Sequence, residues 1–340
     1  MSAPLFEVED LTVEFRGAAE TVRAADGLSL SVARGETFAI VGESGSGKTV
    51  TMMAAMRLLP VPPAHVEARA IRFDGRDIQG LPEREWRRLA GDRMAMVFQD
   101  ALTSLNPVYS VGWQIGEMFR HHRPGMSRSA IRHRVVELLA EVGIPDPASR
   151  VDDYPHQFSG GMRQRVMIAM GIALEPDLLI ADEPTTALDV TVEAQIMDLL
   201  AGLRTRREMA VVLITHDLGL VAENADRVAI MYAGRIMETG RVADVLAGPR
   251  HPYTRGLLAA RPQAAGRGQS LQAIPGSPPN LARPPRGCPF HPRCPLAAPV
   301  CRAERPLLKP GPLGIWAACH AADADAPREQ FPEAPSEAVA

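Results

Sequence analysis

The sequence predicts an α/β fold, and three observations support that prediction. Short apolar or β-branched runs alternate with helical patterns along the first 248 residues, as expected for a chain with a parallel or mixed sheet. A glycine-rich loop stands between one of these runs and a helical segment. The composition, 46% hydrophobic and 23% charged over 340 residues, is that of an ordinary globular chain with roughly two domains.

Four apolar runs are the expected strands of the sheet. They are residues Thr37–Val41, 94–98, 178–181 and 211–215. Between the second and the third run, Ser127 opens a helical pattern that ends before Gly143. This pattern places five apolar side chains on one face, namely Ile131, Val135, Leu138, Leu139 and Val142. We expect a capped amphipathic helix there.

The order of these elements indicates how the chain is organised. We expect a strand-rich core at about 1–99 and 173–248, interrupted by a mostly helical insertion at about 100–172. Eighteen of the 30 prolines follow residue 248, so a boundary is expected there, followed by a C-terminal extension to about residue 320. The tail, residues 321–340, is rich in Ala, Pro, Asp and Glu, and we expect it to be disordered.

Charge and hydropathy exclude several classes of protein. The 37 basic and 40 acidic residues give a net charge of −3, which argues against a protein that binds nucleic acid through charge alone. The longest purely apolar stretch, residues 166–174, has nine residues, whereas a membrane-spanning helix needs about 20. The N-terminus has no basic start followed by an apolar run, so the sequence predicts a cytosolic location.

Residues 42–49 fit the pattern G-x-x-x-x-G-K-S/T between an expected strand and the helical segment 52–59, as this phosphate-binding motif requires. Its glycines let successive backbone N–H groups face a polyphosphate at a helix N-terminus. Lys48 would lie against the β- and γ-phosphates, and Thr49 would offer its hydroxyl to Mg²⁺. A flexible turn is the alternative, but it does not require a lysine at this position. The residues expected to bind the nucleotide are Gly42, Ser44, Gly45, Ser46, Gly47, Lys48 and Thr49.

Acidic residues follow the third expected strand. The run 178–181 ends in Asp182 and Glu183, at the carboxyl edge of the sheet, where ligands bind in open α/β folds. Asp182 would hold Mg²⁺, and Glu183 would polarise the attacking water. His216 follows the fourth run in the same way, and we expect it at the γ-phosphate. Each signal is weak alone, because many strands end in an acidic turn and a lone histidine is usually structural.

Residues 158–165, Phe-Ser-Gly-Gly-Met-Arg-Gln-Arg, resemble the signature of the ABC-type ATPases, whose common form is Leu-Ser-Gly-Gly-Gln. Phenylalanine replaces leucine and methionine replaces glutamine, while the central Ser159, Gly160 and Gly161 are intact. The motif is a second anion site, because the serine caps a helix and the glycines expose its N–H groups; a plain helix cap is the alternative. The resemblance implies that this signature closes over ATP held by another subunit, which makes two composite sites.

Three further family positions occur in the expected order. Gln99 follows an expected strand, and the resemblance implies that it contacts Mg²⁺ or the lytic water. Residues 186–189 resemble the D-loop, which ends in Asp189. Phe15 resembles the aromatic residue that stacks on adenine, although it could equally be core. The resemblance implies a P-loop ABC-type nucleotide-binding domain with a RecA-like core, an antiparallel β subdomain and a helical subdomain, followed by a small Cys/Pro-rich C-terminal extension.

Several stretches outside these motifs resemble the ATPase subunits of oligopeptide and dipeptide importers. They are residues 98–107, 182–191, 251–258, 274–280 and 288–295. The resemblance implies a peripheral ATPase at the cytoplasmic face of the membrane, working with two transmembrane permease subunits, a second ABC ATPase and, indirectly, an external substrate-binding protein. Its cargo would be peptides or related small solutes such as nickel chelates or glutathione. Residues 42–51 resemble the first of the two paired ATPases of such systems.

A soluble ABC ATPase of DNA repair or translation is the alternative function. Repair members usually carry a long coiled-coil or zinc insertion within the core, and ribosome-acting members carry two cassettes in one chain. The sequence shows neither feature.

All four cysteines lie in one proline-rich stretch, as Cys288, Cys294, Cys301 and Cys319. In a reducing compartment such a cluster indicates a metal more than disulfides. The spacing is neither that of a zinc ribbon nor that of a ferredoxin, and four thiolates suit tetrahedral Zn²⁺ or a 4Fe–4S cluster. His291 and His320 are possible additional zinc ligands. The resemblance favours the iron–sulfur cluster, and its role could be redox gating or purely structural. Four unliganded thiols are the alternative, which the clustering in a proline-rich segment disfavours because such a segment could hardly fold unaided.

Overall fold

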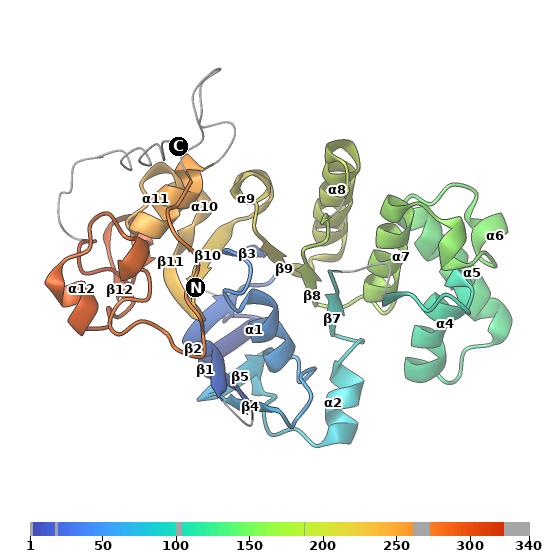
Figure 1. Cartoon of the computed structure of the whole chain (residues 1–340). Coiled ribbons are helices and arrows are strands. Elements are labelled where there is room, and N and C mark those ends of the chain that lie inside the picture. Colours follow the sequence, from blue (N-terminus) through green and yellow to red (C-terminus); the bar gives the residue numbers. More distant parts are fainter. Residues whose placement is uncertain (1–2, 18–19, 100–103, 187, 261–272, 323–340) are drawn as a thin grey trace. The chain divides into compact units, whose positions relative to one another are not determined.

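The computed structural model describes residues 3–17, 20–99, 104–186, 188–260 and 273–322 (Figure 1). The chain forms two compact units, each assembled from three segments. The first, here called the helical unit, comprises Met1–Phe6, Ser31–Thr37 and Arg72–Ile214. The second, here called the loop unit, comprises Glu7–Leu30, Phe38–Ile71 and Thr215–Ala340. Residues 323–340 of the expected disordered tail lie outside the described residues.

Three parallel strands lie at the centre of the helical unit. They are β7 (Met94–Val97), β8 (Leu178–Asp182) and β9 (Ala210–Thr215), whose last residue belongs to the loop unit. Every residue of β8 and β9 is buried, as expected for continuous apolar runs in a parallel sheet. The expected strands at 94–98, 178–181 and 211–215 are therefore present, with bounds shifted by one residue.

Helices make up most of the rest of this unit. They are α2 (Glu83–Leu89), α4 (Val111–His122), α5 (Arg128–Glu141), α6 (Pro147–Arg150), the 3₁₀ turn η1 (Pro155–Gln157), α7 (Gly160–Ile172) and α8 (Val190–Arg207). Helices α4, α5 and α7 pack on one another (Figure 1). The predicted cap of α5 is confirmed, because the Ser127 hydroxyl accepts the Ala130 N–H at 3.2 Å. The apolar face of α5 is buried as predicted. The helix ends just before Gly143, which has a φ of +75°.

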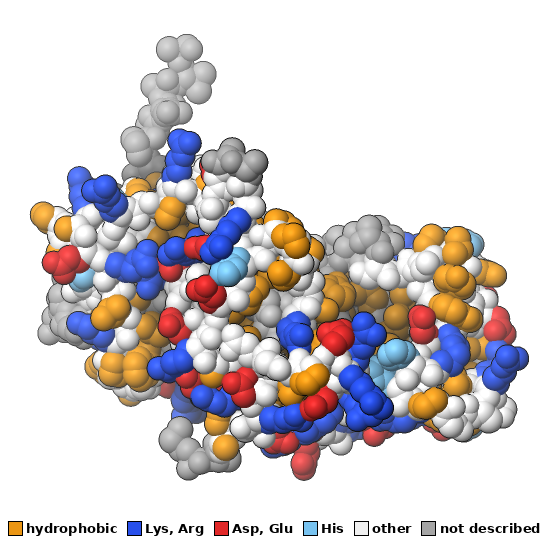
Figure 2. Space-filling model, turned by 90° about the horizontal axis from the view of Figure 1, so that it is seen from below, with side chains coloured by type: hydrophobic (Ala, Val, Ile, Leu, Met, Phe, Trp, Pro, Cys, Tyr) orange, Lys and Arg blue, Asp and Glu red, His pale blue; other side chains and the backbone are white. Residues whose placement is uncertain are grey.

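Exposed charges in the helical unit are largely paired. Arg93 lies between Asp177 and Asp74, at 2.6 and 3.0 Å, and Asp74 also pairs with Arg34. Figure 2 shows the same interspersion of cationic and anionic side chains over one face of the molecule. Ion pairs that are this exposed to solvent contribute little to stability. They are consistent with the nearly equal numbers of basic and acidic residues in the sequence.

The loop unit contains antiparallel strands from the N-terminal part of the chain. Strand β1 (Phe6–Arg16) lies beside β2 (Thr21–Val32) and pairs with β4 (Ala64–Glu67). The chain then enters β5 (Ala70–Phe73), which turns into β6 (Arg76–Asp77) in the helical unit. The predicted antiparallel β part of the fold is thus confirmed.

The other sheet of the loop unit gains strands from the C-terminal extension. Parallel strands β3 (Thr37–Val41) and β10 (Arg227–Tyr232) are followed outward by antiparallel β11 (Arg235–Arg241), β13 (Trp316–Ala317) and β12 (Lys309–Pro310). No strand was expected in the extension, because segments of two residues have no periodicity and β13 takes its register from β11. The extension is therefore part of the sheet.

The helix Val242–Ala247 packs against β10 and β11 of this sheet and is one of the helices of the loop unit. They are α1 (Lys48–Ala55), α9 (Leu218–Asn224), α10 (Val242–Ala247), α11 (Pro252–Ala259) and α12 (Pro299–Ala303), with the 3₁₀ turns η2 (His291–Arg293) and η3 (Pro312–Gly314). The helix expected at 52–59 instead starts at Lys48 and ends at Ala55, because Gly47 forms the N-cap and Arg57 adopts a φ of +53°. Within the described residues, no helix combines the length and apolarity needed to cross a membrane.

One buried cluster joins the extension to the rest of the loop unit. It contains Val41 at the end of β3, Tyr232 on β10, Tyr253 on α11, and Cys288 and Phe290 from the extension. The rings of Tyr232, Tyr253 and Phe290 pack with centroids 4.7 to 5.3 Å apart. Burial of aromatic rings at this spacing is strongly stabilising, so the cysteine-bearing segment is anchored next to the strand that leads into residues 42–49.

Candidate nucleotide-binding site

The phosphate loop connects β3 to α1 and depends on two glycines. A Cβ on Gly42 would collide with the Met231 carbonyl, and one on Gly47 would collide with the Ala24 carbonyl. Gly47 also has a φ of +96°, which glycine adopts readily and other residues do not. The backbone therefore passes so close to its neighbours that these two positions accept no side chain.

Lys48 lies at the start of α1 with its side chain folded over the loop. It is 5% exposed, and its Nζ donates to the carbonyls of Gly42 at 2.8 Å and Glu43 at 3.2 Å. The buried Ser46 hydroxyl has no hydrogen-bond partner among the described residues. Thr49 follows in the first turn of the helix. A cation and backbone N–H groups at a helix N-terminus form the arrangement that binds a polyphosphate.

In the helical unit, the structure brings together two predicted site residues. Gln99 Nε2 donates to Glu183 Oε2 at 3.0 Å, and Thr186 Oγ1 donates to the same oxygen at 2.8 Å. The Glu183 backbone is pinned as well, because its N–H donates to the Ile214 carbonyl at 2.9 Å. Its φ of +45° is unusual for a non-glycine residue. Two donors thus orient the carboxylate beyond the end of β8, while Asp182, the last residue of that strand, is 1% exposed.

The signature residues form the N-terminus of α7. The Ser159 hydroxyl accepts the Met162 N–H at 3.4 Å, as predicted for a helix cap. Phe158, which stands where leucine is common, is 2% exposed and fills an apolar position. A Cβ on Gly161 would lie 2.5 Å from a Val192 methyl group, so a larger residue would disturb the contact between α7 and α8. Helix α7 therefore begins at the two signature glycines.

The remaining predicted residues have simpler surroundings. Asp189 is the N-cap of α8, where its Oδ1 accepts the Val192 N–H at 3.0 Å; Ala187 of the same pattern lies outside the described residues. His216 is exposed and follows the last residue of β9. Phe15 is half-buried on β1, opposite Ala64 of β4.

The four cysteine side chains line one cavity of about 10 Å³ together with His291 and His320, which is roughly the space of one water molecule. Burial raises the pKa of Cys288 to about 11 and that of Cys294 to about 12, so both are neutral thiols at pH 7. Within the described residues, no three His, Cys, Asp or Glu side chains form a metal-binding group. The expected 4Fe–4S or zinc centre is thus not supported by the geometry. Four sulfur atoms that line one cavity are nevertheless the type of ligand that a soft metal prefers.

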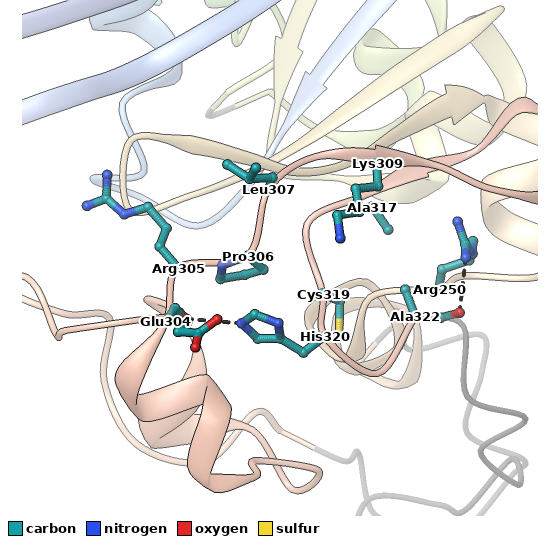
Figure 3. A pocket seen from close by; sticks show the side chains of 10 residues that line it. All are labelled: Arg250, Glu304, Arg305, Pro306, Leu307, Lys309, Ala317, Cys319, His320 and Ala322. Carbon is teal, nitrogen blue, oxygen red and sulfur yellow. Dashed lines mark hydrogen bonds between the residues drawn. The ribbon is translucent and has the colours of Figure 1, made fainter.

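Neither histidine is directed to a cysteine sulfur by its hydrogen bond. His291 Nδ1 bonds with the Cys288 carbonyl at 2.9 Å. Figure 3 shows the His320 ring directed toward Glu304, whose carbonyl it contacts through Nε2 at 3.0 Å, beside a second cavity of about 260 Å³. Cys319 lies at the edge of this second cavity as well. The histidines are therefore tied to the backbone.

Two residues outside the nucleotide-binding motifs also contact the phosphate loop. Arg293, from the cysteine-bearing segment, forms an ion pair with Glu43 at 2.7 Å, and Tyr253 Oη accepts the Glu43 N–H at 3.0 Å. Arg293 and Glu43 are 250 positions apart, so local periodicity could not reveal the pair. Tyr253 and Arg293 lie in the stretches 251–258 and 288–295 that resemble importer ATPases, but neither was expected at the phosphate loop.

Comparisons with known proteins agree with this geometry. The family described as "ABC transporter" matches residues 25–186, and "Oligopeptide/dipeptide transporter, C-terminal region" matches residues 237–301. The dipeptide transport ATP-binding protein DppD of Escherichia coli K12 is 51% identical over 93% of this chain and 96% of its own. The oligopeptide transport ATP-binding protein OppD of Bacillus subtilis 168 is 50% identical over 90% of this chain and 86% of its own.

Solved structures show the same fold. A dimeric post-hydrolysis structure of the ATP-binding cassette MJ0796, bound to ADP and Pi, covers 70% of this chain and 98% of its own with 26% identity and a TM-score of 0.62. Residues 25–186 and 237–301 of this one chain thus match the two parts of the transporter family. The chain belongs to the family of ATP-binding subunits of dipeptide and oligopeptide ABC transporters.

Proposed function

We propose that this chain is the ATP-hydrolysing subunit of a membrane importer and couples ATP binding and hydrolysis to the uptake of dipeptides, oligopeptides or related small solutes. The observation that carries the catalytic part is the Glu183 carboxylate, which Gln99 and Thr186 orient beyond the end of β8. A carboxylate whose position is fixed by hydrogen-bond donors is suited to polarise water. The two-part match to the transporter family supports the transport part.

The proposed roles follow the chemistry of each group. Lys48 and the N–H groups of residues 42–47 bind the phosphates, and Thr49 with Asp182 holds Mg²⁺. Glu183 polarises the attacking water, assisted by Gln99 at the water or the metal. His216 acts at the γ-phosphate. Phe15 stacks on adenine, for which its half-buried ring on β1 leaves one side accessible.

A second ABC ATPase subunit completes the proposed assembly. Ser159, Gly160, Gly161 and Asp189 serve the nucleotide of that partner, since an open helix N-terminus is an anion site. The dimeric form of MJ0796 supports such pairing. Two transmembrane permeases and an external binding protein complete the importer, and the chain lies on the cytoplasmic face. The helical insertion, residues 100–172, passes the motion of closure to the permeases near Gln99.

The cysteine cavity is proposed to bind a metal through thiolates. Four sulfur donors line one space, and a cation would offset the burial that now keeps these thiols protonated. Elemental and acid-labile sulfide analysis after anaerobic purification tests this proposal, with Cys288→Ser as the variant. Iron with sulfide means a 4Fe–4S cluster and zinc alone means a single ion, whereas neither element above the level of the variant overturns the proposal.

The importer assignment is tested by affinity purification of tagged Glu183→Gln protein from detergent-solubilised membranes with ATP and Mg²⁺. Lys48→Ala is the control, because it should not retain ATP in the loop. Mass spectrometry should find two multi-span permeases and a second ABC ATPase, enriched over the control. Ribosomal or DNA-repair proteins, with nothing from the membrane, would overturn the assignment.

A further inference from the structure

The cysteine-bearing segment reaches into the phosphate loop through one side chain. Arg293, on η2 between Cys288 and Cys294, places Nη1 at 2.7 Å from Glu43 Oε2 and Nη2 at 3.1 Å from Glu43 Oε1. The side chains of Arg293 and Glu43 are 6% and 24% exposed. This is a two-point pairing of guanidinium and carboxylate, the geometry in which a charge-assisted hydrogen bond is strongest.

Further bonds fix the guanidinium in place. Its Nε donates to the Pro275 carbonyl at 2.8 Å, and its Nη1 also donates to Tyr232 Oη at 3.3 Å. These partners come from the extension and from β10, so Arg293 is held by the body of the loop unit. It can therefore act as a fixed point for Glu43.

Glu43 is in turn bound to the residues expected to meet the nucleotide. Its N–H donates to Tyr253 Oη at 3.0 Å. Its carbonyl accepts from Lys48 Nζ and from the Ser46 N–H, each at 3.2 Å. The side chain, the N–H and the carbonyl of Glu43 are thus all hydrogen-bonded. Lys48 therefore donates to the carbonyl of the same residue whose carboxylate Arg293 holds.

We infer that Arg293 is a positioning residue for the phosphate loop: by clamping Glu43 it holds residues 42–47 in the form that binds ATP. The inference rests on the proposed function, because it takes this loop to be the ATP site. Preorganisation of a loop improves affinity by removing an ordering cost that binding would otherwise carry. The position of the cysteine-bearing segment therefore sets the affinity of the phosphate loop for ATP.

The test uses the full-length protein and measures binding of a fluorescent ATP analogue, with the KM and kcat of ATP hydrolysis alongside. Arg293→Met and Glu43→Gln are made singly and together. Each single change is expected to raise the Kd and KM about tenfold, as for loss of a buried charge-assisted pair, while kcat changes less than twofold. The double variant should be no worse than either single one, because both remove the same interaction.

Two further variants separate positioning from general stability. Arg302→Met removes an exposed arginine next to Cys301 in the same extension and should leave ATP affinity unchanged. Arg293→Lys retains the charge with fewer donors and should recover part of the affinity; it also replaces Arg293→Met if that variant does not fold. Unchanged Kd values in folded Arg293→Met protein, or additive effects of the two single changes, would overturn the clamp. Failure of the wild-type protein itself to bind ATP would refute the proposed function instead.

Discussion

The amide nitrogen of Gln99 lies 3.0 Å from Oε2 of Glu183. Gln99 is the second residue after β7, and Glu183 is the first residue after β8. Thr186 donates to the same oxygen, so two donors orient the carboxylate through one of its oxygens. A change at Gln99 would therefore reach the proposed base directly. This contact links the residue before the expected helical insertion to the residue proposed to polarise water.

Replacing Glu183 by glutamine should abolish turnover but preserve ATP binding. The amide keeps the size of the side chain and loses its basicity, and general-base catalysis contributes about 10²- to 10⁴-fold to a rate. Steady-state ATPase rates and ATP-analogue binding check this, with the exposed Glu223→Gln as the control. Undiminished turnover in Glu183→Gln would refute the assignment of the base.

Gln99→Ala and Thr186→Val should each slow hydrolysis about tenfold with little change in ATP affinity, because each removes one hydrogen bond to a charged group. Their effects should not multiply in the double variant, since both side chains orient the same oxygen. Thr205→Val is the matched control, because its hydroxyl bonds to the Ala201 carbonyl on the exposed face of α8. Multiplicative losses would show that the two residues act separately.

Local patterns carried most of what the sequence could predict. Residues 42–49 form a loop between a strand and a helix, and the cap at Ser127 and the cap at Ser159 are both present. In each case a motif of a few residues is enough to predict the local element that forms. Gln99 was expected at the site from family order and Glu183 from its position after a strand, and the structure places the two side chains in contact.

What the sequence could not reveal depends on distant partners. The ion pair of Arg293 with Glu43 spans 250 positions, and β12 and β13 take their pairing from β11. Neither feature has a period or a motif, because its energy comes from a partner that only the folded chain supplies. The small cavity among the four cysteines is a similar case. The clustering of the cysteines in the sequence indicated a common site, but it did not predict how their side chains would be arranged.

Gly42→Ala should disable the phosphate loop. The new methyl group would collide with the Met231 carbonyl, which is backbone and cannot turn aside. We expect loss of ATP binding and a fall of about 1–3 kcal/mol in the free energy of unfolding, as for overpacking of a close contact. Gly80→Ala, with open space at its Cβ, is the control. Normal ATP affinity in Gly42→Ala would mean that the loop binds nucleotide in another form.

Stability should fall on acidification because of His251, the buried N-cap of α11. Burial, and then the charge of Arg255, lower the pKa of His251 to about 3. Its ring accepts the Tyr253 N–H at 3.0 Å as a neutral base. Since the unfolded chain takes up this proton near pH 6.5 and the folded chain does not, the free energy of unfolding should drop by about 1.4 kcal/mol per pH unit as the pH falls below 6.5 toward 3.

His251→Asn isolates this contribution, because asparagine also caps helices but does not titrate. Chemical denaturation of both proteins from pH 7 to pH 4 measures the difference in the free energy of unfolding at each pH. Burial raises the pKa of Glu238, so its contribution has the opposite sign, and it is present in both proteins and largely cancels in the comparison. The wild-type protein should lose its stability advantage as the pH falls. A difference that stays constant over this range would mean that His251 takes up its proton over the same pH range in the folded and the unfolded chain, and would contradict its role as a neutral acceptor for Tyr253.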